Sequence, residues 1–345
     1  QLQTDRGRTR LRILVSTTSF PRFDGDVPGR FILDLASALT KAGHQVTVVC
    51  PSYRSDTGVS EITGITVRKV GRFLPSFLKL SADSPLLPQV KGSYIGKLRM
   101  IAFVALQIYH CTIEGRDADV LHSHWLVPSG LCTCVASSIL SKPHVVTIHG
   151  AGLASLETMP AGRTLAAFIV SRSRAITTVS KSQKGRLFRL VTPDKAQSVT
   201  CVPMGVVPSR LHNSAQLNPG GKLGLLFVGR IAEKKGLEHL IKALSMLADQ
   251  GRIEILEVCG SGQLEAQMRH LAQDMGLSEF IWFRGYVSDP ELAESYARAD
   301  IVVVPSVEAR YGDVEGVPVV VLESMFLGKA IVATRVGGIV DVLGS

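Results

Sequence analysis

The sequence predicts an α/β protein with two domains, each built on a parallel β-sheet flanked by helices. The chain has 345 residues, which is more than one hydrophobic core usually holds, and 46% of them are hydrophobic. Short patterns of buried strands alternate with helical stripes along most of the chain. Several of these strands run directly into loops that contain glycine. Together these observations are typical of Rossmann-like β-α-β units.

The domain boundaries follow from composition. Residues 1–10 are polar, basic and without periodicity, so we expect a disordered lead. Residues 208–222 are polar and rich in proline and glycine, which predicts a linker. The first domain is therefore expected over residues 11–207 and the second over residues 223–345.

The first β-α-β unit begins with a strand that starts the segment 11–20. A loop with Gly25 and Gly29 follows, and then a helical stripe that ends at Gly43. Residues 44–50 form the next predicted strand. The glycine spacing is not that of a dinucleotide-binding loop, so dinucleotide binding is not predicted.

Histidines follow two further strands of the first domain. The segment 118–130 is a strand and loop with His122, His124 and Trp125, and the strand starting at residue 143 ends on His149. Loops at the carboxyl ends of strands are the usual ligand-facing positions in open α/β sheets. His122 and His124 would point the same way on a strand, but no third metal ligand is evident.

Other residues give no sign of a metal site or of disulfides. The pairs Asp24/Asp26 and Asp117/Asp119 are of a kind that is common by chance. The six cysteines are scattered singly, mostly in apolar surroundings, which predicts reduced core residues in a cytosolic protein. No apolar run approaches the roughly 20 residues of a membrane span, and residues 100–110 predict a core helix.

The net charge of +9 is shared unevenly between the two halves. Residues 1–212 carry 26 Lys and Arg against 12 Asp and Glu, whereas residues 213–345 carry 12 against 17. Basic residues gather at 68–99 and at 163–189. The first cluster is either a solvated surface or a contact with anionic lipid headgroups, and the second is a candidate membrane or acceptor face. Nucleic acid is not expected as a partner, because no nucleic-acid-binding motif is present.

The second domain opens with a predicted strand over residues 223–228. It runs into Gly229 and Arg230, and a basic turn with Lys235 follows before the next helix. Two cations at the carboxyl end of a strand suit a diphosphate whose negative charge increases as a bond to it breaks. The later Gly260-x-Gly262 loop is weak evidence by itself.

The segment 312–323 holds two carboxylates, Glu315 and Glu323, with seven residues between them. Pro318 suits the first position of a helix, and Gly328 suits the position just past its end. Glu315 would then lie in the loop before the helix and Glu323 in its second turn. The valine-rich run has high β propensity, so strand and helix both remain open here.

The segment PSVEARYGDVEGVPVVVLESMFLGKAIVATRVGG resembles the Glu-x7-Glu region of retaining GT-B glycosyltransferases of family 4. Within it, GDVEGVPVVVLE looks like the subgroup that acts in bacterial cell-surface polysaccharide assembly. The resemblance runs from about residue 11 to the end of the chain. It implies a GT-B fold, in which two Rossmann-like domains with parallel sheets face an interdomain cleft. It also implies sugar transfer from a nucleotide-sugar to an acceptor hydroxyl with the anomeric configuration retained.

The resemblance also implies roles for particular residues. Catalysis would depend on four of them: His149 near the transferred sugar, Glu315, Arg230 and Lys235. Donor binding would involve Gly25, Gly29, Gly229, Arg230, Lys235, Gly262, Tyr286, Val287, Glu315, Gly316, Val317 and Glu323. Acceptor binding would fall to His124 and Trp125. The loop with Gly25 and Gly29 departs from the usual Gly-Gly pair of the family.

No cofactor and no metal is expected, because Arg230 and Lys235 can stabilise the leaving diphosphate. The expected partners are a nucleotide-sugar, a saccharide or lipid-linked acceptor, and the anionic inner face of the cell membrane. A non-catalytic nucleotide-sugar-binding protein and a nucleotide-sugar 2-epimerase are the alternatives. The family continues past the last residue of this chain, so a C-terminal truncation is expected.

Overall fold

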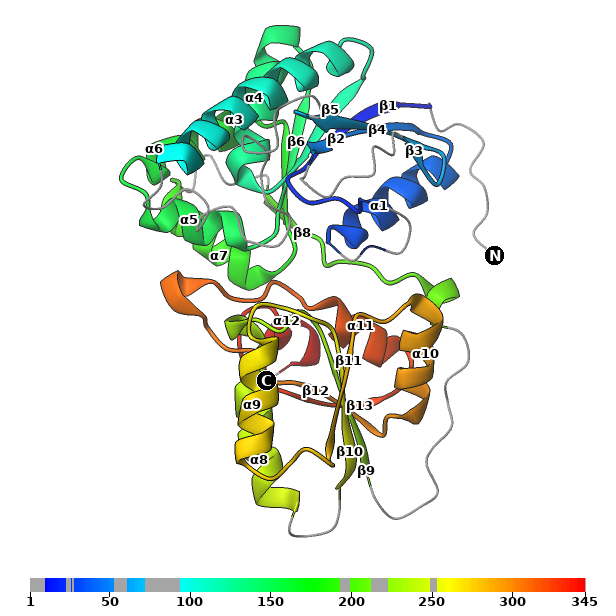
Figure 1. The fold of residues 1–345 in the computed structure, drawn as a ribbon. Coiled ribbons are helices and arrows are strands. Elements are labelled where there is room, and N and C mark those ends of the chain that lie inside the picture. The colour runs from blue at the N-terminus through cyan, green and yellow to red at the C-terminus, as the bar shows by residue number, and fades with distance from the viewer. Residues whose placement is uncertain are drawn as a thin grey trace. The chain divides into compact units, whose positions relative to one another are not determined.

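The structure is a computed structural model that describes residues 10–22, 26, 28–52, 61–71, 94–192, 199–211, 223–248 and 253–344. It forms two compact units, residues 1–178 with 184–202 and residues 179–183 with 203–345. Each unit is an α/β structure with its own sheet, so the predicted fold class is confirmed (Figure 1). Gly25, nearly all of the expected lead and most of the expected linker lie outside the described residues.

The first unit is built on a sheet of eight described strands in the order β3-β4-β2-β1-β5-β6-β7-β8. All neighbouring strands are parallel except the β3–β4 pair. The strands are β1 (Arg12–Ser16), β2 (Gln45–Pro51), β3 (Glu61–Ile62), β4 (Ile65–Val70), β5 (Val120–His124), β6 (His144–Ile148), β7 (Ala175–Thr178) and β8 (Val199–Cys201).

Helices cover both faces of this sheet. Alternate residues of β1 face opposite sides: Val15 packs in one cluster with α1, and Leu14 packs in another with α3 and α4. Figure 1 shows α1 on one side and α3 with α4 on the other. The helices are α1 (Arg30–Lys41), α3 (Tyr94–Gly115), α4 (Leu131–Leu140), α5 (Ala151–Thr158), α6 (Gly162–Arg172) and α7 (Lys181–Leu190), with a helical turn η2 (Leu126–Gly130) before α4.

The second unit has a parallel sheet in the order β11-β10-β9-β12-β13. Leu225 packs with α8 and α9 on one face, and Leu226 packs with α10 and α11 on the other. The strands are β9 (Leu223–Val228), β10 (Ile253–Cys259), β11 (Ile281–Gly285), β12 (Ile301–Val304) and β13 (Ala330–Ala333). The helices are α8 (Leu237–Ala248), α9 (Glu265–Asp274), α10 (Asp289–Arg298), α11 (Val319–Phe326) and α12 (Ile339–Leu343), with short turns η4 (Pro208–Arg210), η5 (Glu233–Lys235) and η6 (Arg310–Gly312).

The second unit begins before the expected linker. Chain residues from Pro203 onward belong to it, and Leu211 is buried in its core beside α10 and α12. The turn η4 precedes Leu211, and Arg210 pairs with Asp289 at 3.4 Å. The polar, proline-rich composition of this segment did not indicate that it packs on the second unit, because a single apolar side chain is enough to attach it to the core.

The valine-rich run forms a helix, α11, which settles the choice that the sequence left open. Pro318 is the N-cap residue, with an extended ψ of 131°, and Val319 is the first helical residue. The proline therefore lies one position earlier than expected. Gly328 has φ 65° and follows the C-cap residue Leu327, as expected for a helix that ends on a left-handed glycine.

Candidate functional site

The loop after β9 brings Lys235 back over Gly229. A Cβ atom on Gly229, which has φ 154°, would lie 3.4 Å from Cε and 3.7 Å from Nζ of Lys235. These are ordinary van der Waals distances, so the lysine packs against the end of the strand, and the positive φ is what favours glycine at position 229. Arg230 is exposed, whereas Lys235 is mostly covered, with 17% of its side chain exposed.

Glu315 lies against this lysine. Its Oε1 is 3.2 Å from Nζ of Lys235 and 3.9 Å from Nζ of Lys234. Lys234 also pairs with Asp313 at 3.3 Å. Burial acts to raise the pKa of Glu315, but Lys235, Lys234 and the charge of Arg230 hold the pKa below its ordinary value. Glu315 is thus an ionised carboxylate that is almost fully buried, at 9% exposed.

The loops that follow β9 and β10 pack closely against each other at two glycines, where a side chain would not fit. A Cβ atom on Gly262 would lie 2.2 Å from the carbonyl oxygen of Ile231, and one on Gly260 would lie 2.0 Å from that of Gly229. The amide of Ile231 donates to the carbonyl of Ser261 at 3.0 Å. Gly262 therefore has a structural reason to be glycine, whether or not it contacts a ligand.

The Glu315–Val317 loop is packed just as closely. A Cβ atom on Gly337 would meet the carbonyl oxygen of Glu315 at 2.1 Å, and one on Gly338 would meet that of Gly316 at 1.9 Å. On Gly316, the added atom would lie 2.7 Å from Nε2 of Gln183. Val317 is buried at 6% exposed. Sequence reasoning did not single out the Gly337–Gly338 pair, although two adjacent glycines after a strand were a signal.

Glu323 lies in the second turn of α11 and accepts a hydrogen bond of 2.7 Å from the hydroxyl of Tyr296 on α10. Tyr296 is fully buried. Burial and the charge of Glu323 raise the pKa of the Tyr296 hydroxyl well above its ordinary value, so Tyr296 remains a hydrogen-bond donor. Sequence reasoning missed Tyr296, because no pattern relates two residues on separate helices.

Tyr286 and Val287 directly follow β11. Tyr286 is 49% exposed and Val287 is half-buried against the α10–α11 core. Because β9, β10, β11 and β12 are parallel, the loops that follow them meet at one edge of the sheet. The structure thus joins Gly229, Lys235 and Glu315 in direct contact, and it puts Tyr286 and Val287 in a loop at the same edge of the sheet.

In the first unit, Gly29 begins α1 with φ 72°, and a Cβ atom there would lie 2.2 Å from the carbonyl oxygen of Ser19. Nearby, Asp26 is buried and accepts hydrogen bonds from Arg22 at 2.7 and 3.0 Å. At the start of β1, Asp119 accepts a hydrogen bond of 2.7 Å from the amide of Arg12. Asp26 and Asp119 therefore each have protein partners.

Four aromatic rings gather at the ends of β5 and β6. Nδ1 of His124 lies 2.9 Å from Nε2 of His149. The His149 ring centroid is 4.9 Å from that of Phe31, and 5.1 Å from those of Trp125 and His124. His124 is only 1% exposed, His149 is half-buried, and Trp125 is half-buried with a positive φ of 68°. Sequence reasoning missed Phe31, the first apolar residue of its helical stripe.

Burial lowers the pKa values of these imidazoles. The pKa of His149 is lowered to about 3 and that of His122 to about 4, and that of His124 lies well below its ordinary value. His122 also hydrogen-bonds the hydroxyl of Thr147 at 2.8 Å. The three rings are therefore neutral near pH 7.

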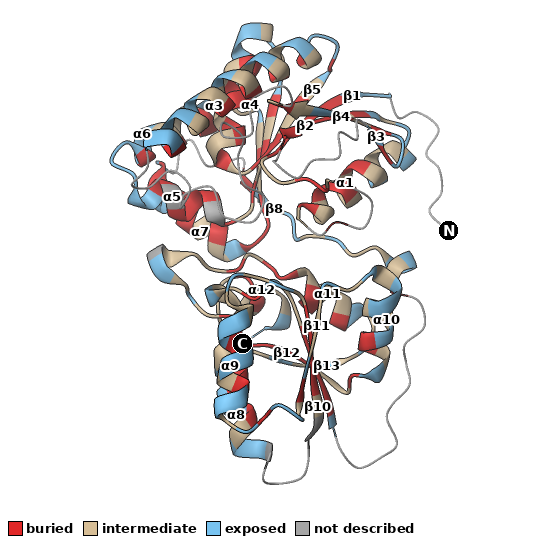
Figure 2. Ribbon diagram, viewed as in Figure 1, coloured by how far each residue is buried: buried red, intermediate tan, exposed pale blue. Residues whose placement is uncertain are grey.

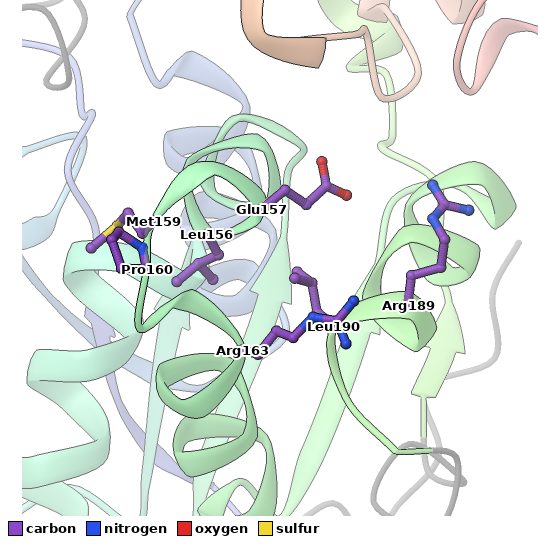
Figure 3. A pocket seen from close by; sticks show the side chains of 7 residues that line it. All are labelled: Leu156, Glu157, Met159, Pro160, Arg163, Arg189 and Leu190. Atoms are coloured by element: carbon purple, nitrogen blue, oxygen red, sulfur yellow. The ribbon is translucent and has the colours of Figure 1, made fainter.

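A separate pocket of about 380 Å³ lies among α5, α6 and α7 of the first unit (Figure 3). It is lined by Leu156, Glu157, Met159, Pro160, Arg163, Arg189 and Leu190. Glu157 pairs with Arg186. Neither Arg163 nor Arg189 forms an ion pair with a described residue, so the lining combines apolar side chains with two arginines that have no ion-pair partner in the described part of the chain.

Among the described residues, no group of three or more His, Cys, Asp and Glu side chains could hold a metal ion. In the same part of the chain, no helix is both long and apolar enough to cross a membrane. All six cysteines are free, as predicted, and five of them are buried.

Comparison with known proteins places both units in sugar-transferring families. The model for Glycosyltransferase Family 4 matches residues 28–210, and that for glycosyl transferases group 1 matches residues 210–345. The chain is 26% identical to the amylovoran biosynthesis glycosyltransferase AmsK of Erwinia amylovora, over 81% of this chain and 68% of that protein. It is 25% identical to the putative colanic acid biosynthesis glycosyltransferase WcaL of Salmonella typhimurium, over 91% and 80%. The crystal structure of HepE from Anabaena in complex with UDP and glucose has the same fold, with a TM-score of 0.70 and 17% identity over 97% of this chain and 84% of that one.

Proposed function

The chain belongs to the glycosyltransferases of family 4, retaining enzymes that transfer sugars from nucleotide-sugars, and we propose that its second unit binds the donor around Lys235, Glu315 and Glu323. The observation that carries this proposal is the buried Lys235–Glu315 ion pair beside Gly229 and Arg230. A buried charge pair costs desolvation free energy. Its position at the ligand-facing edge of the sheet supports a role in binding.

In the proposed mechanism, the donor diphosphate displaces Glu315 from Lys235. A diphosphate brings more negative charge to Lys235 and Arg230 than one carboxylate does, so it is the stronger partner. Glu315 is then available to accept hydrogen bonds from the hydroxyls of the sugar. The same two cations stabilise the diphosphate as the glycosyl bond breaks and its negative charge increases.

The remaining donor contacts come from the turns around this centre. Glu323 accepts hydrogen bonds from the ribose hydroxyls while Tyr296 fixes its carboxylate. Gly316, Val317 and the N-terminus of α11 face the phosphates with free amides. Tyr286 and Val287 contact the base, Gly229 and Gly262 let the backbone approach, and Gly25 and Gly29 do so from the first unit. His149 contacts the transferred sugar, and Trp125 faces the acceptor.

The acceptor in this proposal is a growing saccharide, free or lipid-linked. Two relatives are named for the biosynthesis of amylovoran and colanic acid, which supports an acceptor of the polysaccharide class. A panel of UDP-, GDP- and ADP-glucose tests the donor assignment, with thermal shift as the readout for binding and release of free sugar as the readout for turnover. We expect one nucleotide to stabilise the protein and to be turned over. Binding without any turnover or transfer to any saccharide would contradict the proposal.

A metal-independent reaction is part of the proposal, since Arg230 and Lys235 occupy the place where a divalent cation would act. Activity is expected to survive EDTA. Complete loss in EDTA, with recovery on addition of manganese or magnesium, would contradict it.

We also propose that the first unit docks on the anionic inner face of the cell membrane. Exposed apolar side chains on α3 support this; Figure 2 shows exposed and buried positions along the same helix. The larger of these residues, hereafter the α3 stripe, are Tyr94, Ile95, Leu98, Ile101, Tyr109 and Ile113, each 36–89% exposed. Exposed Lys97 adds positive charge at one end.

When a helix is apolar on both sides and only one side packs on the protein core, the exposed side is expected to bind a partner or a membrane. The opposite side of α3 packs on the sheet through Phe103 and Cys111. An anionic bilayer fits the exposed side best, since it offers hydrocarbon to the stripe and negative charge to the basic unit. The pocket with Arg163 and Arg189 would hold a lipid phosphate on the same unit.

A further inference from the structure

His124 is expected to contact the acceptor, and the structure shows that its side chain is almost completely buried. It is the last residue of β5, and His149 directly follows β6. These strands are parallel neighbours, with His124 opposite Thr147 in the register, so the two imidazoles meet at the sheet edge. His124 is 1% exposed, so any effect that it has on a ligand must pass through a neighbouring side chain.

The neighbour in question is His149. Nδ1 of His124 lies 2.9 Å from Nε2 of His149, and the rings stack at an interplanar angle of 22°. Phe31 and Trp125 also contact the His149 ring, with centroid distances of 4.9 and 5.1 Å. The His149 ring is therefore fixed by one directional bond and by three aromatic contacts.

The hydrogen bond also determines which nitrogen of His149 carries hydrogen. Both rings are neutral near pH 7, because burial lowers both pKa values. Each ring then carries one hydrogen, and only one of the pair donates to the other. The other nitrogen of His124, Nε2, is buried and has no hydrogen-bond partner among the described residues.

If His149 were the donor, Nε2 of His124 would carry a buried hydrogen with no acceptor. Buried N–H groups without a partner are rarer than buried acceptors without one. The favoured arrangement has Nδ1–H of His124 donating to Nε2 of His149. Because Nε2 of His149 then accepts, the single hydrogen of that ring must be on Nδ1.

We propose that His124 is a positioning residue that holds His149 as its Nδ1–H tautomer, so that His149 offers a hydrogen-bond donor to an oxygen of the transferred sugar. The part concerning the sugar rests on the proposed function of His149. The part concerning the tautomer does not, because it follows from the pair alone.

Nitrogen-15 NMR of histidine-labelled protein tests the tautomer directly, with the His149 signals assigned by their loss in a His149→Gln variant. We expect Nδ1 of His149 to be protonated in the unsubstituted protein at pH 7.5. In His124→Phe, which keeps a ring but removes the donor, nothing holds the hydrogen on Nδ1, so the fraction of His149 protonated on Nε2 should rise. In His124→Asn, whose amide nitrogen lies about where Nδ1 of histidine lies, Nδ1 of His149 should stay protonated.

Kinetics with the nucleotide-sugar then tests the consequence. We expect kcat/KM to fall about tenfold in His124→Phe and to recover most of that loss in His124→Asn, as for one hydrogen bond. Nε2 protonation of His149 in the unsubstituted protein would overturn the proposal, and this measurement requires no variant at position 124 to fold. Unchanged kinetics despite the tautomer change in His124→Phe would leave the positioning intact and overturn the role of His149 in sugar contact.

Discussion

In the proposed donor site, Glu315 is the residue that would couple binding of the diphosphate to binding of the sugar. Its carboxylate lies 3.2 Å from Nζ of Lys235, and burial reduces the screening of this pair by water. Any anion that binds Lys235 must therefore compete with Glu315. A nucleotide-sugar recovers the binding free energy lost in this competition, because its sugar hydroxyls can donate hydrogen bonds to the displaced carboxylate. A nucleoside diphosphate without a sugar does not.

This competition predicts opposite effects of Glu315→Gln on two ligands. The nucleoside diphosphate should bind more tightly, because Lys235 no longer has a charged partner to lose. The nucleotide-sugar should lose its advantage over the diphosphate, since a charge-assisted hydrogen bond to the sugar contributes about 1.5–3 kcal/mol. Calorimetric titration of both ligands measures the two changes.

Lys235→Ala should weaken both ligands by tenfold or more, for the same energetic reason. Lys242→Ala is the matched control, because Lys242 is an exposed lysine of the same unit that pairs with Glu238 along α8. If Lys235→Ala and Lys242→Ala bind both ligands alike, the donor assignment is wrong.

Tyr296→Phe tests the role of Glu323 without changing the carboxylate itself. The substitution removes the 2.7 Å hydrogen bond that orients Glu323. Affinity for the donor nucleotide should fall severalfold, and the free energy of unfolding should drop by about 1–3 kcal/mol. With a 2′,3′-dideoxyribose nucleotide the loss of affinity should vanish, because no ribose hydroxyl remains for Glu323. An equal loss with both nucleotides would assign Tyr296 to stability alone.

The alternation of elements was predictable from the sequence, whereas the side-chain partners were not. Strand and helix patterns repeat along the chain, so the two α/β sheets follow from periodicity. Periodicity did not show whether the segment of α11 is a helix or a strand. Valines at 317 and 319–321 favour a strand locally, but Pro318 before Val319 and left-handed Gly328 after Leu327 mark the two ends of a helix. Packing of Val320 and Val321 in the core beside β12 stabilises that helix.

The helix α3 shows the other limit of sequence reading. The apolar segment 100–110 predicted a core helix, and Phe103 and Gln107 are indeed buried. The helix is longer than expected, at 22 residues, and its outer side is apolar as well. Apolar residues on both sides of a helix leave no periodic signal, so the sequence could not show which side would be exposed.

The α3 stripe predicts vesicle binding that depends on apolar contact as well as charge. Ile101→Asp replaces a side chain that is 67% exposed and should weaken binding to anionic vesicles about tenfold or more. Ile139→Asp is the matched control, because Ile139 is 61% exposed on α4 and lies outside the stripe. Sedimentation with anionic and neutral vesicles at low and high salt measures both variants.

The same variants distinguish the membrane from other partners of the stripe. Equal vesicle binding by Ile101→Asp and Ile139→Asp would show that the stripe is not part of the membrane interface. If the unsubstituted protein dimerises, Ile101→Asp does not, and neither protein binds vesicles, the stripe is an interface with a second copy of this chain.

Arg163→Glu should weaken vesicle binding more than Arg116→Glu does, because Arg116 is an exposed arginine of the same unit that does not line the pocket.

At the scale of the whole molecule, charge divides the chain. The basic half coincides with most of the first unit and the acidic half with most of the second. Composition alone gave this division. Composition could not show that four histidines of the first unit are partly or fully buried close together, because that depends on which strand ends meet. His122, His124, His144 and His149 all lie in β5, in β6 or directly after β6.

These histidines predict that the first unit loses stability in mild acid. The pKa values of His122 and His144 are lowered to about 4 and that of His149 to about 3, from an ordinary value of 6.5. In the unfolded chain they take up protons as the pH falls through about 6.5, whereas in the folded unit they stay neutral until about pH 4. The unfolded state therefore binds more protons in this window. Stability is present above pH 6.5 and decreases as the pH falls, by up to about 1.4 kcal/mol per pH unit for each histidine.

Replacing one of them should make this loss shallower. His144 is buried, with its ring nitrogens 2.8 Å from the hydroxyl of Ser123 and 3.1 Å from that of Ser173. His144→Gln should be less stable than the unsubstituted protein at pH 7.5, because it loses well-placed hydrogen bonds. The difference in unfolding free energy between pH 7.5 and pH 5.5 should nevertheless be smaller, because one proton acceptor is gone from the unfolded chain. Urea titrations at the two pH values measure this, and His239→Gln, an exposed histidine of the second unit, is the control. The same pH difference in both variants would show that burial of His144 does not limit the acid stability of the unit.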